Sequence, residues 1–503
     1  MILLLQNRQE YNNDIRAMIM AFYPGVKIAE QPDGQPIQLV FRAKYAETES
    51  FFSLGRLESE EIQQDGNICD VEYIAFERIR GDYRDKTAFR NRLKRAAYGL
   101  LCAYTGRMLP WGDLTGVRPT KIAMKQLKDG MDFEHTVAYY QDVYDTSADK
   151  AKLATRVAQK ELSLVQGIDF ENDYCLYIGI PFCPSRCLYC SFTSYPIGVY
   201  KDKAVKYIEK LKRELAYIAE LYKHKRLVAI YIGGGTPTSI SHELLETLLE
   251  GIDQVYGLGK HAGKEPGNNR VSLKEYTIEA GRPDSITDEK LRVMKNHGVT
   301  RISINPQTMN DETLRTIGRA HTAEQTREAF SMARRAGFDN INMDLIAGLP
   351  GENLDSMRYT LEQVKALNPE SITVHSLAIK RAANLRQQMD TYGTLINQDM
   401  DAMHALAAEA ATALGMEPYY LYRQKNIGGN LENVGYAKPG MECLYNVLIM
   451  EEMTDIIAAG AGSSTKLVFH AENRVERVEN CKSVDDYMNR FDEMLARKNK
   501  WSR

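Results

Sequence analysis

The sequence predicts an α/β protein: a partial (β/α)6 barrel with a small N-terminal α/β domain and a C-terminal α+β extension. Three observations predict this fold class. From Tyr174 onward, short apolar runs alternate with helical stretches, which is the pattern of consecutive βα units in a parallel sheet. Six such units occur, whereas a closed barrel of this kind has eight. The length of 503 residues predicts two or three domains.

The N-terminal domain is expected to cover residues 1–165. Apolar runs and helical periodicity predict strands at Met1–Leu5, Ile37–Tyr45 and Cys69–Phe76, and helices at Tyr11–Tyr23 and Asp85–Thr105. The turn-rich stretch Trp111–Thr120 holds one of the two Trp residues and is expected to dock domains, because most buried Trp side chains serve packing. A polar helical connector is predicted at Asp142–Val165.

The barrel is expected to cover residues 166–380, and residues 381–503 are expected to form the C-terminal extension. The barrel strands are predicted at Cys175–Ile180, Leu227–Ile232, Tyr276–Glu279, Thr300–Ile304, Ile341–Ile346 and Ser371–Leu377. The helices between them are predicted at Lys201–Tyr222, His242–Val255, Asp288–Asn296, Thr322–Ala336 and Leu354–Leu367. Ligands of parallel sheets bind beyond the carboxyl ends of the strands, so the residues that follow each strand are candidates for a site.

Three cysteines, Cys183, Cys187 and Cys190, stand at C-x3-C-x2-C spacing directly after the first barrel strand. A four-iron cluster usually takes four protein thiolates, so three would leave one iron open to a small molecule. A structural zinc site and redox thiols are the alternatives. Zinc needs a fourth ligand, and the nearest spare one is Cys175, which lies on a predicted buried strand. The spacing therefore favours a cluster over zinc.

The composition favours a small-molecule substrate. The 64 Lys and Arg residues nearly balance the 67 Asp and Glu residues, and a net charge of -3 gives no sign of a nucleic-acid or membrane surface. The longest apolar runs, such as Leu227–Ile232, are far shorter than the ~20 residues of a membrane span. No signal-peptide pattern is found, so a cytoplasmic, reducing location is expected. The remaining cysteines are expected to be packed thiols: Cys69, Cys102, Cys175, Cys443 and Cys481.

Glycine-rich and polar motifs follow the next four predicted strands. They are Gly233-Gly-Gly-Thr236-Pro-Thr238, Glu279-Ala-Gly-Arg282-Pro, Asn305-Pro-Gln307 and Asp344-Leu-Ile-Ala-Gly348-Leu-Pro350. Consecutive glycines leave the backbone N–H and C=O groups free to approach a ligand closely. Each motif alone could be a flexible turn or a helix cap. Found together at successive strand ends, they favour one shared ligand.

These motifs resemble those of the radical S-adenosylmethionine enzymes. Within that superfamily, Tyr177-x-x-Ile-Pro-Phe-Cys183, Gly-Gly-Gly-Thr-Pro-Thr and Asp344-Leu-Ile-x-Gly-Leu-Pro are similar to the oxygen-independent coproporphyrinogen III oxidase (coproporphyrinogen dehydrogenase) family. The resemblance covers about residues 174–470. With its extra N-terminal domain, the chain most resembles the long subgroup of this family from Gram-positive bacteria.

The resemblance implies that the three cysteines hold a 4Fe-4S cluster, whose open iron binds the amino and carboxylate groups of S-adenosylmethionine. It implies that this first molecule is contacted by Tyr177, Gly234 and Glu279. A second S-adenosylmethionine molecule would be contacted by the residues at the matching positions: Tyr189, Gly235, Thr236, Gln307, Arg319, Asp344 and Ala378. The resemblance assigns no further catalytic residue.

The resemblance also implies a reaction. The reduced cluster would cleave the carbon–sulfur bond, and the resulting 5'-deoxyadenosyl radical would abstract hydrogen from a propionate side chain, which then loses carbon dioxide and becomes a vinyl group. Two such events convert coproporphyrinogen III to protoporphyrinogen IX in haem biosynthesis. A flavodoxin or ferredoxin would be the electron donor. The carboxylates of this tetrapyrrole substrate would need cationic partners, for which the candidates are Arg282, Lys380, Arg381, Arg423 and Lys425.

Two positions depart from the dehydrogenase pattern and keep other functions open. Well-studied dehydrogenases carry another cysteine where this chain has Phe192, and Cys190-Ser-Phe192 resembles the haem-chaperone branch of the family instead. That branch carries a His where this chain has Tyr445, so a good haem ligand is replaced here. The alternatives to the dehydrogenase are a haem chaperone or haem-binding protein, and radical methyl transfer or ring opening on haem.

Overall fold

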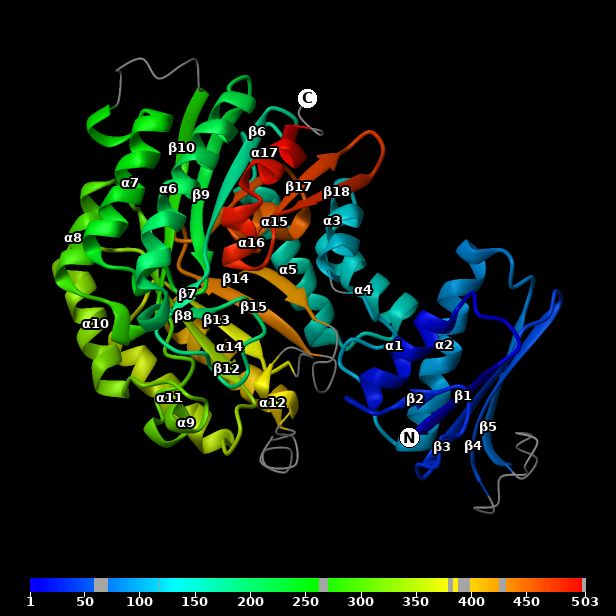
Figure 1. Cartoon of the computed structure of the whole chain (residues 1–503). Helices are drawn as coiled ribbons and strands as arrows, with labels where there is room; N and C mark the ends of the chain where they lie inside the picture. Colours follow the sequence, from blue (N-terminus) through cyan, green and yellow to red (C-terminus); the bar gives the residue numbers. More distant parts are fainter. Residues whose placement is uncertain are drawn as a thin grey trace. The chain divides into compact units, whose positions relative to one another are not determined.

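The computed structural model describes residues 1–57, 71–116, 118–261, 270–378, 383–387, 399–424 and 431–499, and the chain folds into two compact units (Figure 1). Unit 1 contains Met1–Arg156 and Tyr422–Glu432, and unit 2 contains Val157–Leu421 and Asn433–Arg503. A short segment from the C-terminal part of the chain therefore belongs to the N-terminal unit. The domain boundaries expected at residues 165 and 380 stay predictions.

Unit 1 is built on a five-stranded sheet with the strand order β2-β1-β3-β4-β5. Its strands are β1 (Ile2–Gln6), β2 (Ile28–Ala29), β3 (Leu39–Lys44), β4 (Glu49–Leu57) and β5 (Val71–Arg80). β1 runs parallel to β2 and β3, whereas β4 is antiparallel to both of its neighbours. The three strands predicted here are confirmed, except that Cys69 lies outside the described residues, and β2 and β4 were not predicted.

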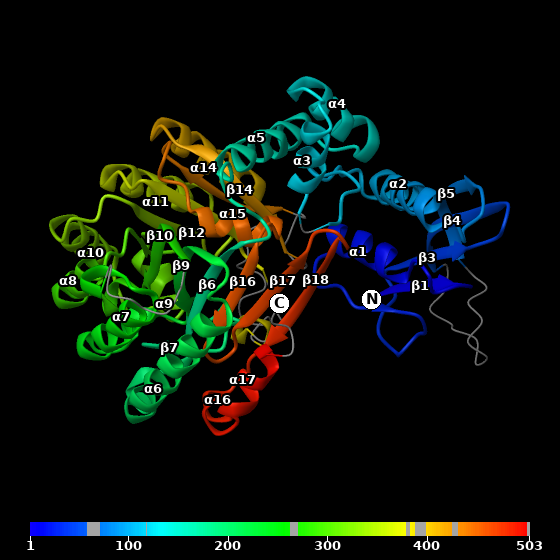
Figure 2. The ribbon, with the colours of Figure 1, turned by 90° about the horizontal axis from the view of Figure 1, so that it is seen from above.

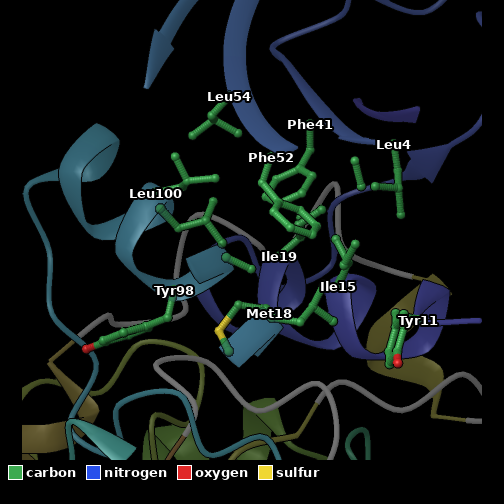
Figure 3. Close-up of a cluster of buried hydrophobic side chains, with 14 of the residues drawn as sticks. Leu4, Tyr11, Ile15, Met18, Ile19, Phe41, Phe52, Leu54, Tyr98 and Leu100 are labelled. Atoms are coloured by element: carbon green, nitrogen blue, oxygen red, sulfur yellow. The ribbon is translucent and has the colours of Figure 1, made fainter. Parts of the chain in front are cut away.

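Two predicted helices, α1 (Asn12–Phe22) and α2 (Lys86–Thr105), pack on one face of this sheet. α2 begins after Asp85, whose side chain accepts a hydrogen bond from the backbone N–H of Ala88, and it ends at Gly106 in the left-handed conformation. Figure 3 shows the resulting apolar core, to which strands and helices contribute Leu4, Ile15, Met18, Phe41, Phe52, Leu54 and Leu100.

The remaining helices of unit 1 are α3 (Thr120–Lys128), α4 (Phe133–Tyr144) and the first part of α5 (Ala148–Leu164). The helical connector predicted at Asp142–Val165 is confirmed as α5 but begins later, at Ala148, because Asp145 adopts the left-handed conformation with φ 52° and ends α4. Trp111 is fully buried, and its Nε1–H group donates to Glu432 at 2.7 Å. Within unit 1, Trp111 thus connects the N-terminal part of the chain to the segment Tyr422–Glu432.

Unit 2 is built on an 11-stranded sheet with the order β14-β15-β13-β12-β11-β10-β9-β6-β16-β17-β18. The six predicted barrel strands are confirmed and pair in parallel: β6 (Asp173–Ile180), β9 (Arg226–Gly234), β10 (Arg270–Gly281), β11 (Arg301–Ile304), β12 (Ile341–Ala347) and β13 (Ser371–Ser376). A seventh parallel strand, β16 (Asp455–Ala459), pairs with β6.

The flanking strands belong to the C-terminal extension. They are β14 (Glu417–Arg423), β15 (Glu432–Ala437), β17 (Ser464–Phe469) and β18 (Arg474–Glu479). β15 is antiparallel to β13, and β17 is antiparallel to both β16 and β18. A parallel sheet thus continues into antiparallel strands on each side, as expected for a partial barrel with an α+β extension.

Helices of the βα units lie on the outer side of the parallel strands (Figure 2). The predicted ones are confirmed as α6 (Ile197–Leu221), α7 (His242–Tyr256), α8 (Asp288–Asn296), α10 (Ala323–Arg335) and α11 (Leu354–Leu367). Unit 2 also contains α9 (Asp311–Thr316), α12 (Asn384–Gln387), α14 (Met400–Ala413), α15 (Leu444–Glu451), α16 (Val484–Asn489) and α17 (Phe491–Asn499). Across the described ranges, no helix has both the length and the apolar character that a membrane crossing requires.

Candidate active site

One face of the parallel strands in unit 2 is polar. Strand register places Glu279, Ser303, Asn342 and Ser371 side by side on neighbouring strands, and side chains two residues along each strand share their face. The opposite face carries apolar residues such as Ile278 and packs toward the helices. Parallel strands are normally apolar on both faces, so a polar face, here called the inner face, indicates a ligand-binding interior.

The cysteine loop begins where β6 ends. Cys183 lies in the short strand β7 (Phe182–Cys183), which pairs with β8 (Tyr195–Pro196), and the backbone N–H of Cys190 donates to the Cys187 carbonyl at 3.2 Å. All three thiols are free of disulfides, and two of them are buried. Burial raises the pKa of the Cys183 thiol to about 11, with smaller contributions in the same direction from Cys190 and Cys187. In the described part of the chain, no three His, Cys, Asp or Glu side chains converge on a single-ion site.

Hydrogen bonds fix this loop to the end of the sheet. The backbone N–H of Leu188 donates to the Ile317 carbonyl at 3.0 Å. The buried guanidinium group of Arg282 donates to Ser185 Oγ at 2.7 Å and forms an ion pair with Asp284 at 2.7 Å. Arg282, a sequence candidate for binding substrate carboxylates, therefore holds the cysteine loop instead.

The glycine motif after β9 packs directly against the cysteine loop. The backbone N–H of Gly235 donates to the Ile180 carbonyl at 2.8 Å, and that of Thr236 donates to the Phe182 carbonyl at 2.7 Å. A Cβ atom at Gly235 would lie 2.5 Å from the Phe182 carbonyl oxygen and 3.0 Å from Cys183 Sγ. Only glycine fits at this position, so backbone rather than side chain faces the cysteine sulfur.

Three tyrosine rings stack on the inner face. The rings of Tyr231 and Tyr445 are 4.4 Å apart, and the Tyr177 ring lies 6.3 Å from each of them. The Tyr231 hydroxyl donates to Glu279 Oε1 at 2.5 Å. Burial raises the pKa of Glu279 to about 7, and Asp344 acts in the same direction, while the hydrogen bonds from Tyr231 and the Gly234 N–H oppose the rise.

Two further predicted residues, Gln307 and Arg319, follow strand β11 in the chain. Arg319 donates to the Tyr189 hydroxyl at 3.3 Å and to the Asn305 carbonyl. Gln307 has a left-handed backbone, with φ 71°, and its N–H donates to the Asp344 carbonyl at 3.0 Å. The buried Gln307 Oε1 atom has no hydrogen-bond partner among the described residues, and a ligand donor would supply one.

Asp344 stands among polar neighbours from two strands. Its carboxyl group accepts from Asn342 at 2.7 Å and lies 3.8 Å from His375 Nε2. Burial favours a higher pKa for Asp344, but His375 and Asn342 outweigh it and leave the pKa below its usual range. Ala378 follows β13 and is half-buried.

The structure describes only some of the other sequence candidates. Arg423 belongs to unit 1, where its guanidinium group donates to the Leu114 carbonyl at 2.7 Å, and Lys380, Arg381 and Lys425 are outside the described residues. Phe192 is 64% exposed. The sequence did not single out five residues of the inner face: Tyr231, Glu275, Ser303, Asn342 and His375. Their alternation with apolar residues along each strand is the pattern that could have identified them.

Comparison with known proteins gives a consistent result. Residues 177–364 match the model of the radical SAM superfamily. The oxygen-independent coproporphyrinogen-III oxidase-like protein HemZ of Bacillus subtilis is 39% identical over 426 residues, which cover 84% of this chain and 83% of that protein. The heme chaperone HemW of the same organism is 33% identical over 275 residues, covering 54% of this chain and 65% of the chaperone.

Among solved structures, coproporphyrinogen III oxidase (HemN) from Escherichia coli, a radical SAM enzyme, aligns with a TM-score of 0.51 at 22% identity, over 67% of this chain and 73% of that one. The expected fold class is confirmed by this likeness. The radical SAM superfamily uses a 4Fe-4S cluster and S-adenosylmethionine, so the expected cofactors are confirmed as well. The three cysteines, none of them in a disulfide, and the glycine backbone beside Cys183 Sγ fit this pair of cofactors. The individual contact residues stay predictions.

Proposed function

Because this chain belongs to the oxygen-independent coproporphyrinogen III oxidase-like family of radical S-adenosylmethionine proteins, we propose that it oxidatively decarboxylates coproporphyrinogen III to protoporphyrinogen IX. The observation that carries this proposal is the similarity to HemZ across 84% of the chain. Each of the two events would remove one hydrogen atom, one electron and carbon dioxide from a propionate side chain, leaving a vinyl group. An electron donor of the flavodoxin or ferredoxin class and a separate electron acceptor are therefore required.

In this proposal, Cys183, Cys187 and Cys190 hold the cluster, with Cys183 Sγ beside the Gly235 backbone. When bound, the cluster and S-adenosylmethionine supply reductive bond cleavage and hydrogen-atom abstraction. The protein binds and orients these groups and excludes water from them. The first S-adenosylmethionine would be contacted by Tyr177, Gly234 and Glu279.

A second S-adenosylmethionine molecule is proposed at the positions that the family resemblance implies, Arg319 among them. Two contacts support this proposal: Arg319 donates to the Tyr189 hydroxyl, and the Gln307 N–H donates to the Asp344 carbonyl. Thr236 Oγ1 lies 3.5 Å from Cys183 Sγ, which places this side chain next to the cluster ligands. Gly235 and Ala378 complete the proposed set.

The proposal is tested by anaerobic reconstitution of the protein with iron and sulfide, followed by incubation with S-adenosylmethionine, a reductant and coproporphyrinogen III. We expect protoporphyrinogen IX to form. Cys187→Ala should lose the cluster and abolish S-adenosylmethionine cleavage, because a three-thiolate site has no spare ligand. Cys102→Ala, in helix α2 of unit 1, is the matched control and should keep both. Unchanged iron content in Cys187→Ala would refute the cluster assignment.

A second candidate function is haem binding and transfer, favoured by the 33% identity to the heme chaperone HemW. The same reconstituted protein separates the two candidates. Stable haem binding without conversion of coproporphyrinogen III would favour the chaperone. Product formation without stable haem binding would favour the dehydrogenase.

A further inference from the structure

We infer that Tyr231 is a positioning residue, whose hydroxyl group holds the Glu279 carboxyl group in the orientation that binds S-adenosylmethionine. The inference rests on the proposed function, in which Glu279 contacts the first S-adenosylmethionine molecule. It concerns a residue that the motifs did not single out, since Tyr231 lies two residues before the glycine run.

The strands bring Tyr231 and Glu279 together on the inner face. Tyr231 pairs with Thr277 in the register of β9 and β10, and Glu279 is the next residue on that face of β10. The resulting hydrogen bond, from the Tyr231 hydroxyl to Glu279 Oε1, is 2.5 Å long. Such a short contact to a carboxyl group belongs to the stronger class of hydrogen bonds.

The first glycine of the motif leaves room for this pair. A Cβ atom at Gly233 would lie 3.0 Å from Glu279 Cδ and 3.0 Å from Tyr231 Cε1. A side chain there would therefore have to displace one of the two partners. Two reasons therefore explain why position 233 is a glycine. The Tyr231–Glu279 contact needs the space, and a ligand can approach the bare backbone closely.

The Tyr231 ring is itself held in place. Tyr445 stacks on it with a centroid distance of 4.4 Å and an interplanar angle of 20°. Tyr445 is fixed in turn at the start of helix α15, where Glu275 accepts from the backbone N–H groups of Leu444 at 2.6 Å and Tyr445 at 3.4 Å. The ring can thus hold its hydroxyl in one position.

Charged and titratable groups surround Glu279 from several elements. They are Tyr177 on β6, Tyr231 on β9, Asp344 on β12, His375 on β13 and Tyr445 on α15. Asp344 raises the pKa of Glu279, whereas His375, the Tyr231 hydroxyl and the Gly234 N–H lower it. Removing the Tyr231 hydroxyl should therefore raise the pKa of Glu279 and leave less carboxylate to bind the ligand near pH 7.

The test compares Tyr231→Phe with Tyr276→Phe in the reconstituted holoprotein. Tyr276 is buried on the opposite face of β10, so its variant also loses one hydroxyl but leaves the inner face intact. The dissociation constant of S-adenosylmethionine is measured by calorimetric titration between about pH 6 and 9. We expect Tyr231→Phe to bind roughly tenfold more weakly at pH 7 and to move the midpoint of the pH dependence upward. Tyr276→Phe should match the wild type.

The outcomes separate this inference from the proposed function. If Glu279→Gln leaves the affinity for S-adenosylmethionine unchanged, the proposed contact is wrong and the inference falls with it. If Glu279→Gln weakens binding while Tyr231→Phe shifts neither affinity nor pH midpoint, only the inference is overturned. Substitution of Tyr231 by 3-fluorotyrosine keeps the fold and strengthens the donor, so it should move the midpoint downward even if Tyr231→Phe fails to hold the cluster.

Discussion

Glu275 and Glu279 share one face of β10, yet the two ends of that face are built differently. Glu275 is buried and accepts hydrogen bonds from the N–H groups of Leu444 and Tyr445, from the Cys443 thiol at 3.2 Å and from Thr277 Oγ1 at 3.1 Å. Glu279 is half-buried and accepts from Tyr231 and the Gly234 N–H.

The difference shows how one strand serves two purposes. At the Glu275 end, a carboxylate caps the N-terminus of helix α15, so its oxygens are occupied by the protein. At the Glu279 end, near the carboxyl ends of the strands, the carboxyl group keeps acceptor capacity for a ligand. Protein groups occupy the carboxyl group at the first end, and the carboxyl group at the second end is the proposed ligand contact. Three predictions test this contrast and the glycine motif that lies next to Glu279.

The largest effect on stability is expected at Glu275. Glu275→Ala would leave the N–H groups at the start of α15 without their acceptor, and we expect the free energy of unfolding to fall by about 2–4 kcal/mol. Glu279→Gln should change it by less than about 1 kcal/mol at pH 7, because the amide keeps an acceptor for Tyr231. Urea unfolding measures both values, and equal losses would contradict the contrast.

A smaller loss is expected where the glycine motif meets the cysteine loop. Gly235→Ala would place a methyl group 2.5 Å from a backbone oxygen that cannot rotate away, so we expect about 1–3 kcal/mol of destabilisation and a lower iron content after reconstitution. The control is Gly99→Ala in α2, where a Cβ atom meets nothing within 4 Å. Gly99→Ala should be stabilising by about 0.5–1 kcal/mol. Normal cluster loading in Gly235→Ala would show that the loop can rearrange.

The last prediction concerns a pH dependence of stability at Glu279. Its folded-state pKa of about 7 lies above the ordinary value of 4.5, so the folded protein holds the proton more tightly than the unfolded chain. Stability from this group is present below pH 4.5 and is lost as the pH rises through 7. Between pH 5.5 and 8 the loss should be about 2 kcal/mol relative to Glu279→Gln, as measured by urea unfolding of both proteins. Parallel stability curves would contradict it.

Much of this protein follows from the sequence alone. Six parallel strands and their helices were predicted because each buried strand is a short apolar run and each helix has its own periodicity, both of which are local properties. The cysteine spacing is local as well and predicted a cluster with one open iron. The family resemblance that the motifs carry implied S-adenosylmethionine, and the superfamily match confirms both cofactors. The position of each motif after a strand also placed the site at one end of the sheet.

The tertiary structure decided what each polar side chain does. Arg282 and Glu279 belong to the same sequence motif. The Arg282 guanidinium group is bound by Asp284 and Ser185, whereas the Glu279 carboxyl group keeps acceptor capacity. Tyr231, Glu275 and Tyr445 meet only when distant strands and a C-terminal helix pack together. Contacts across more than 150 residues of chain leave no local pattern, since they depend on strand order and register. The sequence, through the family resemblance that it carries, therefore indicated the cofactors, and the tertiary structure decided which polar side chains are already bound by other protein groups.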